Sequence, residues 1–134
     1  MKPELSKRSV YWLDKHRYYE LKHFCMQYPL WKDILVSMDG FSKNQYVEKI
    51  ITNTGYGRPT EDAAIARLYY ADRIDMINKT ADLVDPVIGK YLLRGVALGV
   101  SYDILKTGMD IPCGREYYYD IYRRFFYELD KVRK

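Results

Sequence analysis

Apolar residues recur at steps of three and four along most of the chain, which is the spacing of helices that bury one face. Asp14 suits the N-cap of a first helix, and Pro29 is predicted to end that helix and to open a second one. The apolar stripe of the first helix consists of Tyr18, Leu21, Cys25 and Tyr28. Asp39 and Gly40 are predicted to stop the second helix, whereas residues 41–60 fit a helical turn, a short strand or a loop.

A long helix is predicted from Thr60 to Asp85, and its apolar residues fall on two sides. One side holds Ile65, Leu68, Tyr69, Met76 and Leu83. The roughly opposite side holds Tyr70, Ile74, Ile77, Ala81 and Val84. A helix that is apolar on two sides should be covered on both, either by the N-terminal helices and the C-terminal segment or by a dimer partner.

Three further helices follow the long one. Pro86 opens the first of them, and Gly99 is a natural stop for it. Ser101 caps the second, which is short. The last helix is predicted to start at Pro112 or Cys113 and to run to the end of the chain.

The last helix has separate inward and outward faces when it is placed on a helical wheel. The inward face is predicted to hold Tyr118, Ile121, Tyr122, Phe125, Leu129 and Val132. The outward face is predicted to hold Glu116, Tyr119, Arg123, Tyr127, Asp130 and Lys134, with Arg115 on its N-terminal flank. Part of the tyrosine run is therefore expected in the core and part at the surface.

Residues 86–126 have the layout of a helix-turn-helix, in which a short helix and a tight turn precede a longer helix. In that motif the start of the last helix enters the major groove of DNA. The residues predicted to bind DNA are Ser101, Lys106, Arg115, Glu116, Tyr119, Arg123 and Arg124. Arginine bonds guanine edges or phosphates and tyrosine contacts phosphate, while Glu116 either accepts from a cytosine amino group or stays solvated.

The stretches "LLRGVALGVSYDIL" and "YYYDIYRRFF" resemble the C-terminal, sigma-region-4-like helix-turn-helix of phage transcriptional activators of the RinA and ArpU type. Gly99 and Ser101 match the G-x-S opening of that unit, and Ile111 stands where its apolar turn residue is expected. The pairs Tyr117-Tyr118 and Arg123-Arg124 match its last helix. The resemblance is best over residues 91–126 and implies a small all-α protein that regulates transcription by binding DNA.

The chain departs from the pattern of this family at the helix crossing and in the turn. Leu105 and Lys106 stand where a small residue is usual, and Asp110 replaces the glycine that is usual just before the apolar turn residue. These departures bear on how the two helices pack and on which residues of the last helix face outward.

The predicted elements define an all-α protein of about six helices with a C-terminal helix-turn-helix. Residues 1–59 form a basic and aromatic N-terminal helical region, and residues 60–134 form the long helix and the helix-turn-helix unit. A chain of 134 residues can bury one core without a metal or a disulfide, so we expect the two parts to make one compact domain.

Composition indicates which kind of partner and which cellular compartment to expect. Fifteen tyrosines, against four phenylalanines and two tryptophans, favour half-buried surfaces and interfaces, and a formal charge of +4 is a mild preference for an anionic partner. Cys25 and Cys113 match no paired zinc or disulfide spacing, which is typical of a reduced protein. With no signal peptide and no apolar stretch of 18 residues, we expect a cytoplasmic protein with no membrane partner.

No motif in the sequence indicates catalysis or a cofactor. The glycine-rich nucleotide loops, the nucleophile elbow and the H-E-x-x-H pattern are all missing from the sequence. His16, His23 and Cys25 are conceivable zinc ligands, but no fourth ligand is evident and Cys25 falls on the apolar stripe of its helix. Cys113 is near a helix N-terminus, where thiol pKa values fall, but it has no histidine beside it in sequence. We therefore expect no enzyme, no catalytic residue, no metal site and no cofactor.

The leading hypothesis is a phage or prophage type of transcriptional regulator that binds double-stranded DNA as a homo-oligomer, most simply a dimer. RNA polymerase is a further candidate partner for the basic N-terminal block. Two alternatives remain open. A small-terminase-like DNA-packaging protein would form rings, and a structural or protein-interaction module would use its tyrosines as an interface and ignore DNA.

Overall fold

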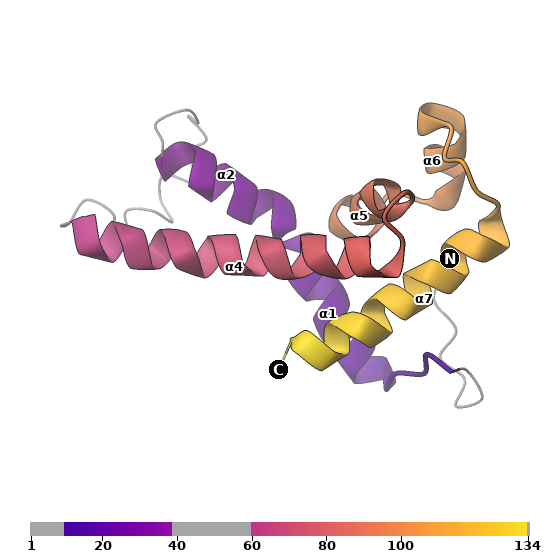
Figure 1. The fold of residues 1–134 in the computed structure, drawn as a ribbon, viewed down its shortest axis with the longest axis horizontal. Coiled ribbons are helices and arrows are strands. Elements are labelled where there is room, and N and C mark those ends of the chain that lie inside the picture. The colour runs from indigo at the N-terminus through magenta and orange to yellow at the C-terminus, as the bar shows by residue number, and fades with distance from the viewer. Residues whose placement is uncertain (1–9, 39–59, 134) are drawn as a thin grey trace. The chain divides into compact units, whose positions relative to one another are not determined.

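The computed structural model describes residues 10–38 and 60–133, with side chains from Asp62 onward in the second stretch. Helices account for 81% of these residues and no strand occurs among them, so the all-α prediction is confirmed. The helices are α1 (Lys15–Met26), α2 (Tyr28–Met38), α4 (Thr60–Val84), α5 (Gly89–Leu98), α6 (Tyr102–Met109) and α7 (Arg115–Val132) (Figure 1). The predictions for residues 1–9 and 39–59, including the helix stop at Asp39 and Gly40, and for Lys134 lie outside the described residues.

Local signals in the sequence explain where the first helices begin and end. The carboxylate of Asp14 accepts the backbone N–H of His16 at 3.0 Å, so Asp14 caps α1 as predicted. α1 ends at Met26, a little before Pro29, and α2 starts at Tyr28 with Pro29 in its first turn. Proline fits this first turn because its missing N–H would have no partner inside the helix there.

The chain divides into two compact units. The first unit consists of Met1–Met26 and Met76–Lys134, and the second consists of Gln27–Asp75. In the second unit, α2 buries Tyr28, Trp31 and Ile34, which lie three residues apart and so share one face of the helix.

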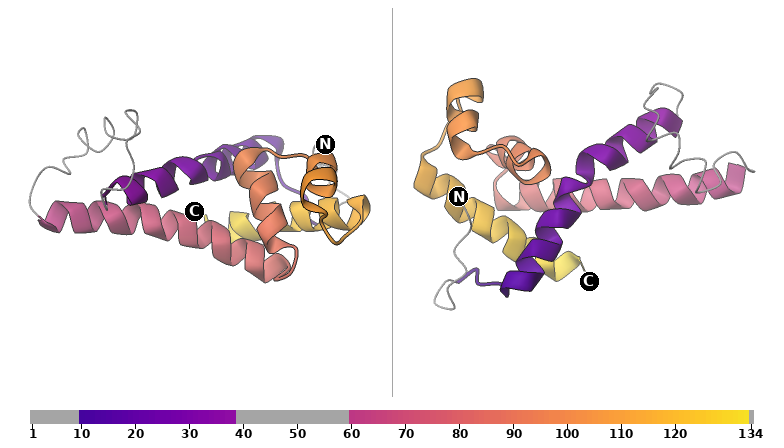
Figure 2. Two further views of the ribbon diagram at one scale, coloured as in Figure 1. Left: turned by 90° about the horizontal axis from the view of Figure 1, so that it is seen from above. Right: turned by 180° about the vertical axis from the view of Figure 1, so that it is seen from behind.

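Helix packing in the first unit centres on α5 and α7. α1 contacts both of these helices, and α5 also contacts α6. Two views of the ribbon from opposite sides show α1 crossing α7 (Figures 1 and 2). The crossing is held by aromatic and ionic contacts: the rings of Tyr18 and Phe126 meet edge to face at 5.1 Å, and Arg17 Nε lies 2.6 Å from Asp130 Oδ1.

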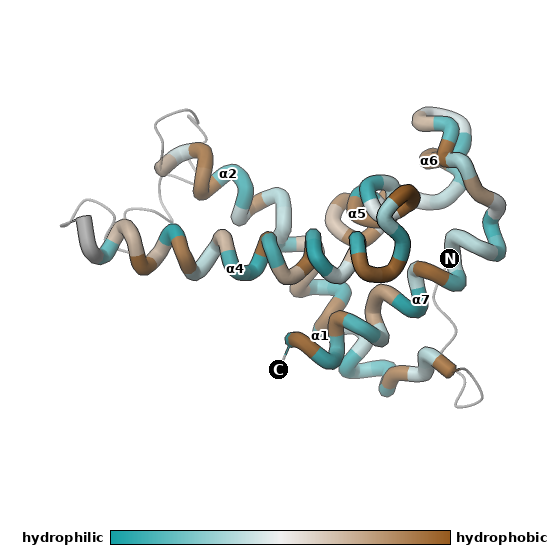
Figure 3. The backbone as a smooth tube through the Cα atoms, in the orientation of Figure 1, coloured by the Kyte–Doolittle hydropathy of each residue, from teal (hydrophilic) through white to brown (hydrophobic). Residues whose placement is uncertain are grey.

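The buried face of α7 largely follows its helical period. Polar and apolar residues alternate along this helix (Figure 3), and the buried members of the predicted inward face are Tyr118, Ile121, Tyr122, Phe125 and Leu129. The prediction for Val132 is wrong, because this last residue of α7 is 51% exposed. Phe126, which lay outside the predicted set, is buried against α1 through Tyr18.

The two apolar sides of α4 have different environments. Ile74, Ile77, Ala81 and Val84 are buried, as expected for a core face. On the other side, Ile65, Leu68 and Leu83 are each more than 60% exposed. The described residues therefore cover only one apolar side of α4, and cover of the other side by a dimer partner stays a prediction.

Candidate nucleic-acid interface

α6 is a short helix with a defined beginning. Gly99 ends α5 with a positive φ of 69°, a conformation that glycine adopts without a steric penalty. Two residues later, Ser101 Oγ accepts the backbone N–H of Ile104 at 3.4 Å, which is the capping interaction predicted for this serine. The α5–α6 connection is thus fixed at both ends.

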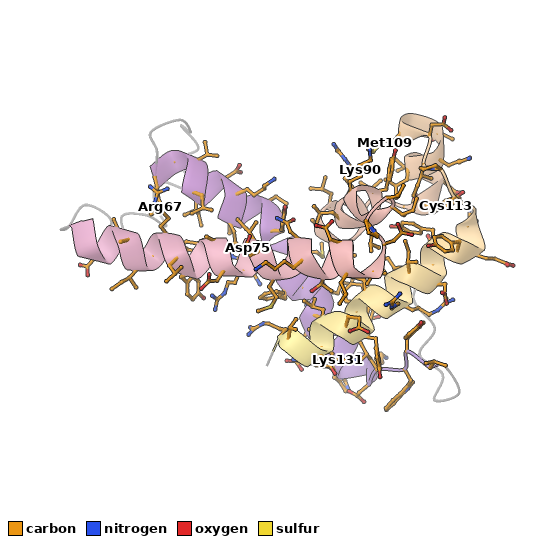
Figure 4. The ribbon with its side chains drawn as sticks, in the orientation of Figure 1. Arg67, Asp75, Lys90, Met109, Cys113 and Lys131 are labelled. Atoms are coloured by element: carbon orange, nitrogen blue, oxygen red, sulfur yellow. The ribbon has the colours of Figure 1, made fainter. Side chains whose placement is uncertain are left out.

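The connection from α6 to α7 is a tight turn around an apolar residue. The backbone N–H groups of Asp110 and Ile111 both donate to the carbonyl of Leu105, and the Ile111 side chain is fully buried. Asp110 has a φ of 52°, and aspartate is one of the few residues besides glycine that tolerate this left-handed conformation. The turn therefore forms without glycine at this position. Met109 and Cys113 lie on either side of it (Figure 4).

Tyrosine side chains hold α6 against the start of α7. Tyr102 Oη donates a hydrogen bond of 2.6 Å to the carbonyl oxygen of Cys113. The ring of Tyr102 also lies 5.6 Å from the ring of Tyr118, an aromatic contact in the favourable distance range. Together with buried Leu105, these contacts fix which sides of α6 and α7 remain at the surface.

The residues predicted to bind DNA are not equally available. Ser101, Lys106, Arg115 and Glu116 are exposed, and Arg123 and Arg124 are half-buried. Arg115 already pairs with Asp103 and places its guanidinium 5.3 Å from the centre of the Tyr102 ring.

The two arginines further along α7 also differ from each other. Arg123 lies 3.8 Å from Asp120 one turn before it, a long and partly exposed ion pair. Arg124 forms no ion pair with a described residue. Lys106 and Arg124 are thus the most readily available cations of the predicted set.

The predicted outward position of Tyr119 is wrong. Its side chain is only 5% exposed, and its ring packs 5.1 Å from Tyr118, 5.9 Å from Tyr122 and 6.5 Å from Tyr102. Because α1, α5 and residues of α6 all lie against α7, the buried arc of this helix is wider than a single apolar stripe. Tyr119 is therefore a core residue and is not available at the surface.

Tyr117 occupies the surface position that the sequence assigned to Tyr119. It is 50% exposed, and its hydroxyl donates a hydrogen bond to Oδ2 of Asp85, which precedes α5. The other carboxylate oxygen of Asp85 accepts the backbone N–H groups of Val87 and Ile88, both at 2.9 Å. Asp85 thus links the start of α5 to the start of α7. The sequence signal for this turn was an aspartate directly before Pro86.

The ionisation of Asp85 follows from these contacts. Desolvation raises the pKa of the carboxyl group, but the hydrogen bonds from Tyr117 and from the backbone of Ile88 and Val87 outweigh it, so the net pKa is lowered. The same hydrogen bond raises the pKa of the Tyr117 hydroxyl, which therefore stays protonated as a donor.

Charges of both signs balance over the α6–α7 surface. Residues 101–124 contain four basic side chains, Lys106, Arg115, Arg123 and Arg124, and four acidic ones, Asp103, Asp110, Glu116 and Asp120. The positive charge of the chain therefore comes from other segments. Any anion held at this surface must be bound by local pairing rather than by a broad positive field.

Three further features bear on possible chemistry: the Cys113 thiol, clusters of metal-binding side chains and membrane-spanning helices. Burial raises the pKa of the Cys113 thiol, with a further increase from Asp85, so the lowered pKa that its position near a helix N-terminus suggested is not found. Within residues 10–38 and 60–133, no three metal-binding side chains cluster. None of the helices described there combines the length and the apolar character needed to cross a membrane.

Comparisons with known proteins do not assign the chain to a group. No model of a known protein family matches it, no curated protein matches its sequence, and no solved structure matches its fold.

Proposed function

We propose that the protein is a phage or prophage type of transcriptional regulator that binds double-stranded DNA through α6 and α7, used as a helix-turn-helix. The observation that carries this proposal is the α6–α7 arrangement: an eight-residue helix capped by Ser101, a turn built on Asp110 and Ile111, and a long helix whose first two turns expose polar side chains. A short helix and tight turn before a longer helix is the layout of that motif. The resemblance to activators of the RinA and ArpU type points the same way.

Three cations and one carboxylate carry the proposed DNA contacts. Lys106 on α6 and the Arg123–Arg124 pair on α7 contact phosphates, while Glu116 in the first turn of α7 faces a base edge. Arg115 contacts DNA only if a phosphate replaces Asp103 as the partner of its guanidinium. Tyr119 has no part in the proposed contacts because it is buried.

The balanced charge of this surface predicts that DNA binding depends only weakly on salt concentration. Three phosphate contacts predict a slope of about −3 for the logarithm of affinity against the logarithm of salt concentration. The test is a fluorescence-anisotropy titration of the full chain against short duplexes from its genomic neighbourhood, at several salt concentrations. Preference for one duplex with this shallow slope would support the proposal. No binding to any duplex at low salt would overturn it.

Single substitutions test the assignment of the surface. Arg124→Ala should weaken binding to all duplexes and reduce the salt slope by about 1, because one phosphate contact is lost. Lys131→Ala is the matched control: Lys131 lies seven residues later on the same side of α7, about 10 Å further along the helix. Equal effects of the two substitutions would contradict binding through the start of α7. Arg123→Ala should also weaken binding while leaving the melting temperature nearly unchanged.

A second candidate function rests on the exposed side of α4. Ile65 and Leu68, one helical turn apart, are both more than 60% exposed, which favours a protein contact at this helix. A protein-interaction module, or a second copy of the chain, would cover these residues. Sedimentation analysis separates the candidates: a dimer that binds DNA fits the regulator, a ring-sized mass fits a small-terminase-like packaging protein, and self-association without DNA binding fits an interaction module.

A further inference from the structure

A cavity of about 340 Å³ lies inside the first unit, bounded by α1, α5, the α5–α6 connection and α7. Its lining residues from α1 and α5 are Lys22, Met26, Gly95 and Val96. Gly99, Val100 and Ser101 of the connection and Tyr118, Tyr119 and Tyr122 of α7 complete it. Cavities that hold small organic ligands have volumes from about 300 Å³ upward, so this one is large enough for a molecule of one ring.

The described residues that line the cavity carry one charge, which is positive. Lys22 is the only ionised side chain among the described residues that line it, and its ammonium forms no ion pair with a described residue. The ammonium lies over the ring of Tyr19, 5.8 Å from its centre. Burial raises the pKa of Tyr118 and of Tyr122, so both hydroxyls stay protonated and add no negative charge.

The hydroxyl of Tyr118 is buried beside the cavity. Tyr118 is 1% exposed, and its Oη makes no hydrogen bond with any described residue. The oxygen lies against Gly95, where a Cβ would overlap it, so the absence of a side chain at this position of α5 leaves room for the hydroxyl. A buried polar group without a partner costs free energy, commonly about 1–3 kcal/mol. Because this hydroxyl has almost no accessible surface and faces Gly95, it offers no contact to a molecule in the cavity.

The other walls combine aromatic and aliphatic side chains. The rings of Tyr119 and Tyr122 meet at 5.9 Å with an angle of 65° between their planes, and Val96, Val100 and Met26 add aliphatic and thioether surface. Ser101 stands at the N-terminus of α6, where the helix carries partial positive charge. The cavity thus combines aromatic walls, one cation and a helix N-terminus.

We propose that this cavity binds a small aromatic carboxylate, with the ring against the tyrosines of α7 and the carboxylate held by Lys22 and Ser101. This binding site does not rest on the proposed function, because it needs no DNA and is tested without it.

The first experiment compares two probes of the same shape that differ in charge. Amide NMR spectra of the ¹⁵N-labelled full chain are recorded during titration with benzoate and, separately, with neutral benzamide. Benzoate should shift the amide signals of Gly95, Gly99 and Ser101 at concentrations on the order of 1 mM, and benzamide should bind at least about fivefold more weakly, since a charge-assisted contact is lost. Equal shifts by both probes, or shifts confined to residues outside the cavity, would overturn the proposal.

Matched lysine variants test the assigned cation. Lys22→Gln should weaken benzoate binding about five- to tenfold, the effect of one charged hydrogen bond at a partly exposed site. Lys90→Gln is the control, because the Lys90 ammonium also lies over a tyrosine ring, 5.2 Å from the centre of Tyr91, but does not line the cavity. An equal loss in both variants would mean that benzoate follows net charge alone, which contradicts the site.

Discussion

α7 and α4 both carry apolar side chains on more than one side, yet only α7 buries them broadly. α1 and α5 pack on α7, and Tyr102 of α6 reaches Tyr118 and Tyr119, so its buried arc extends from Phe125 to Tyr119. α4 buries Ile77 completely while Leu68 stays 61% exposed. The comparison shows that a periodic pattern tells which residues can be buried, whereas the number of neighbouring helices decides how many of them are.

The largest expected effect comes from the broadly buried helix. Phe125→Ala should lower the free energy of unfolding by about 3–5 kcal/mol, because Phe125 is fully buried and its removal leaves a cavity. Urea denaturation followed by circular dichroism measures this loss. A loss below about 1 kcal/mol would mean that the helices around α7 can collapse into the space, and the contrast with α4 would fail.

A smaller effect is expected where α5 approaches α7. Gly95→Ala should cost about 1–3 kcal/mol, because the new methyl group overlaps Tyr118 Oη and forces packed atoms apart. Gly108→Ala in α6 is the matched control: a Cβ there meets no atom within 4 Å, so the change should stabilise by about 0.5–1 kcal/mol through helix propensity. Denaturation of Gly95→Ala combined with Tyr118→Phe should show most of the loss restored. No restoration would mean that other contacts oppose the methyl group.

The link between Asp85 and Tyr117 predicts a pH effect. Because the pKa of Asp85 is lowered in the folded chain, its contribution to stability is complete above the unfolded value of about 3.9 and is lost as the pH falls through the folded value. Tyr117→Phe removes one hydrogen bond to the carboxylate and should raise the pKa of Asp85, measured by NMR titration of its carboxyl carbon. Tyr127→Phe, on the same helix, should leave it unchanged. An unchanged pKa of Asp85 in Tyr117→Phe would mean that this hydrogen bond does not link α5 to α7.

The smallest effect is expected on the exposed side of α4. Leu68→Ala should change the free energy of unfolding by less than about 0.5 kcal/mol, because the side chain is already 61% exposed. Denaturation at two protein concentrations checks this. A loss above about 1 kcal/mol that grows with concentration would mean that a second copy covers this side, and α4 would then resemble α7.

Much of the α6–α7 arrangement could be predicted because its signals are local. The cap at Ser101, the stop at Gly99 and the apolar turn residue Ile111 each depend on neighbours within a few residues. The tight turn at Asp110 also has a local solution, since aspartate tolerates the left-handed conformation that glycine adopts most easily. Propensity and capping chemistry are sufficient at such positions.

The orientation of the tyrosines could not be predicted in the same way. Tyr117 and Tyr119 are chemically identical, and the wheel placed Tyr119 outward, yet Tyr119 is buried and Tyr117 is exposed. The pairing of Arg115 with Asp103 likewise joins residues twelve positions apart on different helices. Such contacts depend on which helices meet and at what angle, which no period within one helix specifies.

The sequence by itself determined the all-α class, the capping residues, the turn between α6 and α7 and most of the buried face of α7, because helix period and capping act over one or two turns. Tertiary structure alone decided the width of that buried face, the exposure of one side of α4, the link from Tyr117 to Asp85 and the cavity beside Tyr118. The physical reason is that burial and long-range hydrogen bonds are properties of several helices packed together.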